Sequence, residues 1–204
     1  PGFQEGQWSV QDESAMSAAR LVAPKPGETI LDMCAAPGGK TTHLAELSGD
    51  AASIIACDIS DDRLERIRQN AVRLQLTSIQ TLRVSKDGSG FPDQQFDAVL
   101  VDVPCSNSGV LNRRPEARWR FDSTSLAELV QIQTKLLILA CERVKPGGRV
   151  VYSTCSLEPE ENEGVVRSVL TAFPDFELTQ QTQHLPGQPA DGAFQARLER
   201  MNRD

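Results

Sequence analysis

Short β-rich apolar runs alternate with helical patterns along this chain of 204 residues, and this alternation constrains the fold more than any other feature. Strand patterns occupy 28–34, 53–59, 79–84, 96–104 and 148–155, and 176–179 and 193–198 form a closing hairpin around a Gly- and Pro-containing loop. Helical patterns occupy 11–22, 61–75, 123–143 and 158–172. This order predicts an α/β fold with a mostly parallel sheet, helices on both faces and a single domain over 1–204.

Capping signals set the expected helix boundaries. Asp12 suits the N-cap of the first helix, and Asp61 suits the positive N-terminus of the second. Lys145-Pro146-Gly147-Gly148 predicts the end of the third helix. Pro159 predicts the first position of the last helix, because that position needs no backbone N–H.

Composition excludes several classes of protein. A net charge of −7 argues against a general nucleic-acid coat. No apolar run approaches the roughly 20 residues that span a bilayer, and the start does not resemble a secretory signal. The five cysteines lack the spacing of a disulfide scaffold, which predicts free thiols in the cytoplasm. Because the chain opens at Pro1, we expect a fragment or a processed chain.

Chemistry-bearing side chains fall at the ends of the predicted strands. The residues concerned are Cys34, Asp58, Asp87, Asp102, Cys105 and Cys155. Parallel α/β sheets bind ligands at the carboxyl ends of their strands. We therefore expect these residues to form one site.

The Gly-rich segment from Cys34 to Thr41 predicts a cofactor loop. It is not a phosphate loop, because Cys34 stands where that pattern needs glycine, and the dinucleotide pattern of three spaced glycines is missing. Asp58 could accept hydrogen bonds from ribose hydroxyls, and Asp87 could reach an adenine amino group. S-adenosylmethionine fits these parts better than ATP or NAD. In the alternative interpretation, Asp58 caps the next helix and Asp87 is an ordinary turn residue.

Cys105 and Cys155 suggest covalent chemistry, because both thiols should face the cofactor loop. The residues alone allow either cysteine to attack. A pair of buried small residues and a redox pair are the alternatives, although no Cys-x-x-Cys arrangement supports the latter. Two further thiols, Cys57 and Cys141, are expected in the core. The two histidines lack metal-ligand spacing, and no metal site is predicted.

A basic segment follows the first of these cysteines. It contains Arg113, Arg114, Arg118 and Arg120, with Trp119 among them. Arginine beside an aromatic ring can neutralise phosphate and stack a base, so we expect Arg113, Arg114, Arg118 and Trp119 to bind substrate. The alternative is a solvated loop.

Four segments resemble the Sun-type, RsmB-like RNA cytosine-carbon-5 methyltransferases. They are Asp32-Met33-Cys34-Ala35-Ala36-Pro37-Gly38-Gly39-Lys40-Thr41, Asp102-Val103-Pro104-Cys105-Ser106, Ser153-Thr154-Cys155-Ser156 and Pro159-Glu160-Glu161-Asn162-Glu163. The resemblance covers almost the whole chain. Two segments depart from the family pattern: Asn107-Ser108-Gly109 after Pro-Cys-Ser, and Asp191-Gly192-Ala193-Phe194 in the tail.

The resemblance implies a Rossmann-like class I S-adenosylmethionine-dependent methyltransferase with a seven-stranded sheet whose last strand is antiparallel. It implies that the cofactor is bound by Cys34, Ala35, Ala36, Pro37, Gly38, Gly39, Lys40, Asp58, Arg63, Asp87 and Asp102. It further implies Cys155 as nucleophile and Cys105 as the releasing partner, with Asp102 at the cytosine edge or the methionine end of the cofactor. Family members commonly carry an N-terminal RNA-binding portion, to which nothing in this chain corresponds.

The expected reaction is methyl transfer to carbon 5 of a cytosine in RNA, with small-subunit rRNA as the expected substrate. Attack by a thiolate at carbon 6 is needed because carbon 5 of cytosine is otherwise a poor nucleophile. Two alternatives stay open. One is a DNA cytosine methyltransferase that uses Cys105 as nucleophile, and the other is a catalytically idle RNA-binding module.

Overall fold

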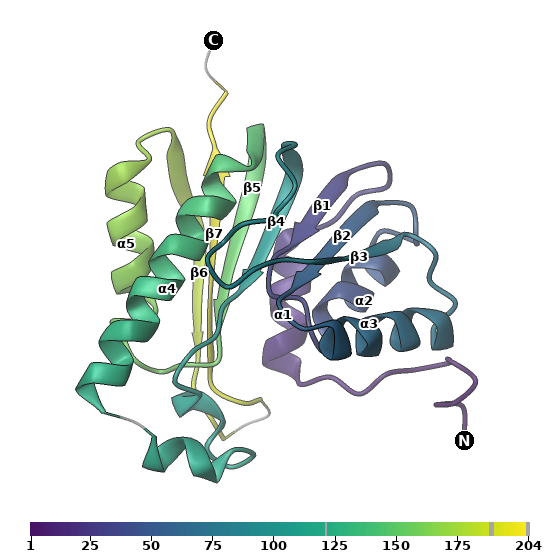
Figure 1. Ribbon diagram of the computed structural model, residues 1–204, viewed down its shortest axis with the longest axis horizontal. Coiled ribbons are helices and arrows are strands. Elements are labelled where there is room, and N and C mark those ends of the chain that lie inside the picture. The colour runs from purple at the N-terminus through teal and green to yellow at the C-terminus, as the bar shows by residue number, and fades with distance from the viewer. Residues whose placement is uncertain (121, 188–189, 203–204) are drawn as a thin grey trace.

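The computed structural model describes residues 1–120, 122–187 and 190–202 (Figure 1). Its strands are β1 Thr29–Asp32, β2 Ser53–Asp58, β3 Ile79–Arg83, β4 Phe96–Asp102, β5 Val144–Thr154, β6 Phe176–His184 and β7 Ala193–Arg200. Its α-helices are α1 Glu13–Val22, α2 Gly39–Leu47, α3 Asp61–Arg73, α4 Ser123–Glu142 and α5 Glu163–Ala172. Two short 3-10 helices, η1 Ser108–Val110 and η2 Pro115–Trp119, lie between β4 and α4.

The seven strands form one sheet in the order β3-β2-β1-β4-β5-β7-β6. Every neighbouring pair from β3 to β5 is parallel, and β7 runs antiparallel to both β5 and β6. The predicted mostly parallel sheet with an antiparallel last strand is therefore confirmed. Within the closing hairpin, residues 188–189 of the predicted loop lie outside the described residues.

Helices cover both faces of the sheet, as predicted, because successive strand residues point to opposite sides (Figure 1). Ile30 and Leu100 belong to a buried cluster with residues of α1 and α2. Their neighbours Leu31 and Val101 belong to the cluster that includes residues of α4 and α5. The core strands are thus apolar on both faces, which is typical of parallel sheets.

Of two predicted helix boundaries, the start of α1 is confirmed and the helix end at Lys145–Gly148 is wrong. Asp12 caps α1 as predicted, and its carboxylate accepts a hydrogen bond from the Ser14 N–H at 3.0 Å. The segment Lys145–Gly148, predicted to end a helix, lies within β5. A register shift between Phe96 and Ala98 accommodates the extra residues against β4.

The prediction that Pro159 begins the last helix is wrong. Residues 159–162 form a turn, and α5 starts at Glu163. The reason is that Glu161 and Asn162 are fully buried and form hydrogen bonds with residues outside the helix. A helix that started at Pro159 would carry these side chains away from those partners.

Helix α4 is more apolar than the sequence analysis recognised. The helix has 20 residues, an 18-residue window of it has a mean hydropathy of 1.2, and it meets the length and composition of a membrane span, although a single such helix is weak evidence. Leu137, Ala140 and Cys141 are buried in the main core cluster. Because these side chains pack on the sheet, α4 serves as a core helix of this domain.

Arg149, in the middle of β5, anchors the strand that leads to Cys155. The buried Arg149 guanidinium donates to the carbonyl oxygens of Val22 and Ala23 and to the Glu28 carboxylate. Burial alone would raise the pKa of Glu28, but hydrogen bonds from Arg149 and from the Lys25 N–H hold it below its usual value. This cluster fixes the end of α1 against β5.

We expect Arg149→Ala to lower the free energy of unfolding by about 3–5 kcal/mol, because it leaves a partly buried carboxylate and two carbonyl oxygens without their donor. Urea unfolding followed by circular dichroism measures this change. Arg167→Ala, at an exposed position of α5, is the matched control and should change stability little. Equal losses in the two variants would contradict this role of Arg149.

Candidate active site

The carboxyl ends of β4 and β5 bring two cysteines together. The strands are parallel, and Asp102 pairs with Ser153 in the register. Cys105 and Cys155 follow within three residues of these positions, and their Sγ atoms lie 2.8 Å apart. The Cys155 N–H also donates to the Cys105 Sγ at 3.3 Å. Both thiols are free, so either can react.

The two thiols differ in their electrostatic surroundings. A hydrogen bond from Cys105 lowers the pKa of Cys155, with help from the positive charges of Lys40 and Arg114 and against burial and the Asp102 carboxylate. The same hydrogen bond, together with burial, raises the pKa of Cys105 well above its usual value. The geometry therefore favours a thiolate on Cys155 and a protonated thiol on Cys105.

Asn107, in the first segment that departs from the family pattern, contacts both cysteines. It adopts a left-handed backbone with φ of 62°, which asparagine tolerates better than most residues. Its Nδ2 donates to the Cys105 carbonyl oxygen at 2.9 Å, and its Oδ1 lies 3.2 Å from the Cys155 Sγ. The local loop therefore closes over the thiol pair.

The other departing segment meets this loop at Gly109. The Gly109 N–H donates to the Cys155 carbonyl oxygen at 3.0 Å, and the Gly192 N–H donates to the Gly109 carbonyl oxygen at 2.8 Å. A Cβ atom at Gly109 would collide with the Gly192 backbone. The tail thus packs directly on the loop that holds the thiols.

Lys40 and Asp102 form an ion pair of 2.7 Å between the cofactor loop and the end of β4. Burial lowers the pKa of Lys40, but the Asp102 charge and hydrogen bond outweigh burial and raise it. The ammonium is therefore held charged beside the Cys155 sulfur. The structure brings Lys40, Asp102 and Cys155 into one electrostatic group.

The predicted cofactor loop connects β1 to the N-terminus of α2. Gly38 has φ of 103° at the N-cap, and a Cβ atom there would press on Ile67 of α3 at 3.1 Å. The next glycine, Gly39, has open space, since its nearest neighbour would be Gln11 at 3.9 Å. The loop thus presents backbone and small side chains at a helix N-terminus.

Asp58 and Arg63 hold this loop from the neighbouring strand. The Asp58 carboxylate accepts from the Ala36 N–H and the Ser60 N–H, each at 3.3 Å. Arg63 lies 3.3 Å from Asp58 and donates to the Ala36 carbonyl oxygen at 3.0 Å. Asp58 therefore supports both the loop and the start of α3, and Arg63 positions Asp58.

Asp87 is placed in an exposed turn after β3. Its carboxylate accepts hydrogen bonds from the Ser89 N–H and hydroxyl, at 2.9 and 2.8 Å, and these bonds lower the pKa of Asp87. This geometry matches the alternative interpretation of Asp87 as a turn residue. Its contact with adenine stays a prediction.

Asp32 is a buried carboxylate beneath the loop that the sequence analysis did not select. Its Oδ2 accepts from the Thr41 hydroxyl at 2.7 Å, and its Oδ1 has no partner within the residues described. Burial, opposed by the Thr41 hydrogen bond and reinforced by Asp102, raises the pKa of Asp32 to about 7. Its position at the end of β1 was the signal that could have identified it.

The basic segment divides into two kinds of arginine. Arg113 forms ion pairs of 2.8 Å with Asp12 and with Asp191, so its guanidinium joins the start of α1 to the tail. No salt bridge joins Arg114, Arg118 or Arg120 to a carboxylate within the described ranges. Trp119 is 86% exposed. Arg113 therefore ties the basic segment to the start of α1 and to the tail. Substrate binding by Arg113, Arg114, Arg118 and Trp119 stays a prediction.

Glu161 is a second residue that sequence reasoning did not select, and it joins the two cysteine loops. Its fully buried carboxylate accepts from the Ser106 N–H at 2.9 Å and from the hydroxyls of Ser106 and Ser156 at 2.5 Å each. Gln133 of α4 donates to it at 2.7 Å and to the Pro104 carbonyl oxygen at 3.0 Å. Because each serine directly follows one of the cysteines, this carboxylate fixes the distance between the thiols.

Asn162 supports the same arrangement from the adjacent position. Its Oδ1 accepts from the Thr154 hydroxyl at 2.7 Å, and its Nδ2 donates to the Ser156 carbonyl oxygen at 3.0 Å. The Tyr152 hydroxyl donates to the Glu161 carbonyl oxygen at 2.6 Å. The turn before α5 is thus a buried polar support for the end of β5.

Sheet order, a Gly-rich turn from β1 into α2 and an acidic end of β2 define a class I S-adenosylmethionine-dependent methyltransferase. The chain belongs to the family of 16S rRNA methyltransferases RsmB/F, whose model matches residues 19–199.

Curated relatives and solved structures agree with this assignment. The chain is 42% identical over 212 residues to ribosomal RNA small subunit methyltransferase B of Salmonella paratyphi B, covering 97% of this chain and 48% of the relative. NSun6 from Pyrococcus horikoshii, solved with SFG, has a TM-score of 0.90 at 29% identity, covering 99% of this chain and 55% of that one. A methyltransferase homolog protein from Pyrococcus horikoshii has a TM-score of 0.84 at 33% identity, covering 98% and 70%. The chain spans about half the length of the curated relatives that it matches.

We expect Cys155 to be alkylated by iodoacetamide before Cys105, with an apparent pKa below the usual thiol value of about 8.5. Only the thiolate reacts, so the Cys155 rate should level off above that pKa. Cys105→Ala removes the hydrogen-bond donor and should raise the apparent pKa of Cys155. Peptide mass spectrometry across a pH series measures both rates. An unchanged Cys155 profile in Cys105→Ala would contradict the shared hydrogen bond.

We expect Glu161→Ala to lower the free energy of unfolding by roughly 3 kcal/mol or more, because it leaves several buried donors without an acceptor. It should also raise the apparent pKa of Cys155, since the cysteine loops are no longer held together. Urea unfolding and the same alkylation series measure the two effects. Glu160→Ala, an exposed neighbour in the same turn, is the control, and equal behaviour of the two variants would refute the role of Glu161.

Proposed function

We propose that this chain transfers a methyl group from S-adenosylmethionine to carbon 5 of a cytosine in RNA, with small-subunit rRNA as substrate. The observation that carries the proposal is the thiol pair at 2.8 Å, in which Cys155 has a lowered pKa and Cys105 a raised one. This asymmetry supplies one nucleophile and one partner that keeps its proton. Relatives named as rRNA small subunit methyltransferases support the RNA substrate.

The proposed reaction starts at the Cys155 thiolate. Its sulfur adds to carbon 6 of the cytosine, which breaks the carbon 5–carbon 6 double bond and places the electron pair on carbon 5. Bound S-adenosylmethionine supplies an electrophilic methyl group. After Cys155 has added to the ring, Cys105 gives up its own proton to solvent water, and its thiolate takes the proton from carbon 5 once carbon 5 carries the methyl group. The electron pair of that carbon–hydrogen bond re-forms the double bond, and the sulfur of Cys155 leaves carbon 6 as a thiolate. Cys105 is the releasing partner because it lies against the sulfur that must leave.

The residues around the loop fit this cofactor. Gly38 and Gly39 leave the backbone open at the N-terminus of α2, and Asp58 lies at the end of β2, where it can accept from ribose hydroxyls. The free buried Oδ1 of Asp32 is a further acceptor beneath the loop. Lys40 and Asp102 lie between the loop and Cys155, so Asp102 suits the methionine end or the cytosine edge. The relative solved with SFG, an S-adenosylmethionine analogue, supports the same site.

RNA contacts are proposed for the exposed part of the basic segment. Arg114 and Arg118 carry no carboxylate partner within the described residues, and the exposed Trp119 ring offers a stacking surface. The target base must leave its stack to be attacked at both ring carbons. Free thiols agree with a cytoplasmic enzyme, which is the localisation that we propose.

Two alternatives predict different outcomes. A DNA cytosine methyltransferase would use Cys105 as nucleophile, but Cys105 has the raised pKa of the pair. A catalytically idle RNA-binding module would not need the Lys40–Asp102 ion pair beside two thiols at the same edge of the sheet. Covalent trapping separates all three possibilities.

We expect Cys105→Ala to accumulate a covalent protein–RNA adduct with S-adenosylmethionine and cytosine-containing rRNA, because release of the Cys155 sulfur is slowed. Turnover should fall roughly 10²–10⁴-fold, as for loss of a proton-transfer group. Cys155→Ala should give no adduct. A denaturing gel with labelled RNA shows the adduct as a shifted band.

Cys141→Ala, which removes a buried core thiol, is the control and should behave as the parent does. A band with Cys155→Ala and none with Cys105→Ala would move the nucleophile to Cys105 and favour the DNA enzyme. RNA binding without adduct or methyl transfer in every variant would favour the idle module.

A further inference from the structure

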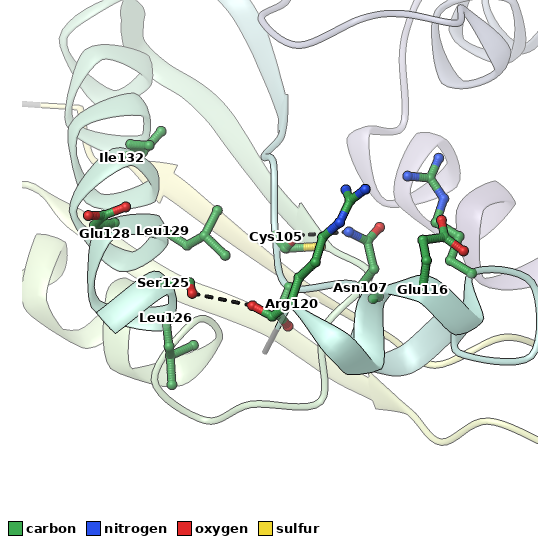
Figure 2. Close-up of a pocket in the computed structure, with 12 residues that line it drawn as sticks. Cys105, Asn107, Glu116, Arg120, Ser125, Leu126, Glu128, Leu129 and Ile132 are labelled. Atoms are coloured by element: carbon green, nitrogen blue, oxygen red, sulfur yellow. Dashed lines mark hydrogen bonds between the residues drawn. The ribbon is translucent and has the colours of Figure 1, made fainter. Parts of the chain in front are cut away.

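A cavity of about 330 Å³ lies between η2 and the first turns of α4, directly beside Cys105 (Figure 2). Leu126, Leu129 and Ile132 of α4 form an apolar wall. Cys105 and Asn107 line the side that faces the thiol pair, and the close-up shows them across the opening from α4. The volume is at the lower end of the range for ligand pockets, which suits one small group such as a nucleotide.

The cavity is not the place where the reacting base meets the cofactor. Its lining includes Cys105 but neither Cys155 nor Asp102, and no residue of the cofactor loop. Cys105 therefore separates the cavity from the Lys40–Asp102 side of the site. A group in the cavity would lie next to the target cytosine without being modified.

Two arginines at the cavity form no salt bridge with a carboxylate of the described residues. Arg114 and Arg120 line it, and neither has a carboxylate within salt-bridge distance among residues 1–120, 122–187 and 190–202. Glu128 lines the α4 side of the cavity, whereas Glu116 belongs to η2 and lies on the same side as the arginines, so phosphate is favoured where Arg114 and Arg120 together outweigh Glu116 (Figure 2). Figure 2 shows Arg120 and Glu128 on opposite sides of the opening. The η2 side of the cavity thus carries two positive charges against one negative charge, and the α4 side carries one negative charge.

We propose that this cavity binds the nucleotide directly adjacent to the target cytosine in the RNA strand. The base of that nucleotide packs on Leu129 and Ile132, while its phosphate contacts Arg114 and Arg120. This inference rests on the proposed function, because it takes an RNA strand to pass the thiol pair. It makes the cavity a specificity subsite, since a base held here fixes which cytosine reaches Cys155.

The test compares short single-stranded RNAs of about nine nucleotides that contain one cytosine, a length within the range for one binding module. In two of them, the nucleotide 5′ or 3′ of the cytosine is abasic, so the phosphate stays and only the base is lost. Fluorescence anisotropy gives each dissociation constant. We expect the parent chain to bind the intact RNA roughly 5- to 150-fold more tightly than one of the abasic RNAs.

Leu129→Asn and Ile132→Asn replace the apolar wall without adding an aromatic ring or a charge. Both should remove the preference for the intact RNA, and Ile132, which is 45% exposed, tolerates a polar side chain without loss of folding. Val72→Asn, at a 78% exposed apolar position of α3, is the matched control and should keep the preference. Circular dichroism checks that each variant is folded.

The outcomes separate this inference from the proposed function, because methyl transfer is measured on the same RNAs. Transfer by the parent with no preference against either abasic RNA overturns the subsite and keeps the function. A preference that the Asn variants lose, without methyl transfer, supports the subsite and rejects the function. A preference that Leu129→Asn and Ile132→Asn retain, or no RNA binding at all, overturns the subsite.

Discussion

Two sulfur atoms held 2.8 Å apart need a rigid frame, and here the frame is a buried carboxylate. Glu161 receives hydrogen bonds from Ser106, from Ser156 and from Gln133 of α4. Each serine is covalently next to one of the cysteines, so a shift of either loop would break a buried hydrogen bond. Such a shift costs free energy because the unpaired group has no water to replace its partner. The distance between the two thiols is therefore determined by hydrogen bonds to Glu161, which does not itself take part in the reaction.

This frame makes the two thiols unequal. With the sulfurs held together, only one proton can lie between them, and its position depends on the surrounding charges. The positive charges of Lys40 and Arg114 favour the thiolate on Cys155. The negative charge of Glu161 disfavours a thiolate on Cys105. Asp102 opposes the Cys155 anion but also holds Lys40 in place. The positive charge of Lys40 thus offsets the repulsion between the Asp102 carboxylate and the Cys155 thiolate.

The sequence predicted the sheet and its functional edge because apolar periodicity and strand ends are local properties. It failed at Pro159, where a proline followed by acidic residues is typical of a helix start but forms a turn. Glu161 and Asn162 were missed for the same reason, since an acidic run looks solvated until its partners from β4, β5 and α4 are known. The ion pairs of Arg113 could not be predicted either, because its partners Asp12 and Asp191 are distant in the chain. The contacts of Glu161, Asn162 and Arg113 depend on partners that are distant in the chain, and residue type alone does not reveal those partners.

Cys105 lines the cavity beside α4 as well as contacting Cys155, and the proposed release of the Cys155 sulfur does not require this second contact. It lies between the Cys155 sulfur and the cavity beside α4, so the thiol that we propose as the releasing partner is also part of the cavity wall. The loop that we propose for the cofactor is built from the ends of β1 and β2 and the start of α2, whereas the cavity is lined by residues of η2 and α4. Asp102, Cys105 and Cys155, at the ends of β4 and β5, connect the two regions. A strand seated at the cavity would therefore be sensed by the same loop that holds the releasing thiol, which couples substrate placement to the completion of the reaction.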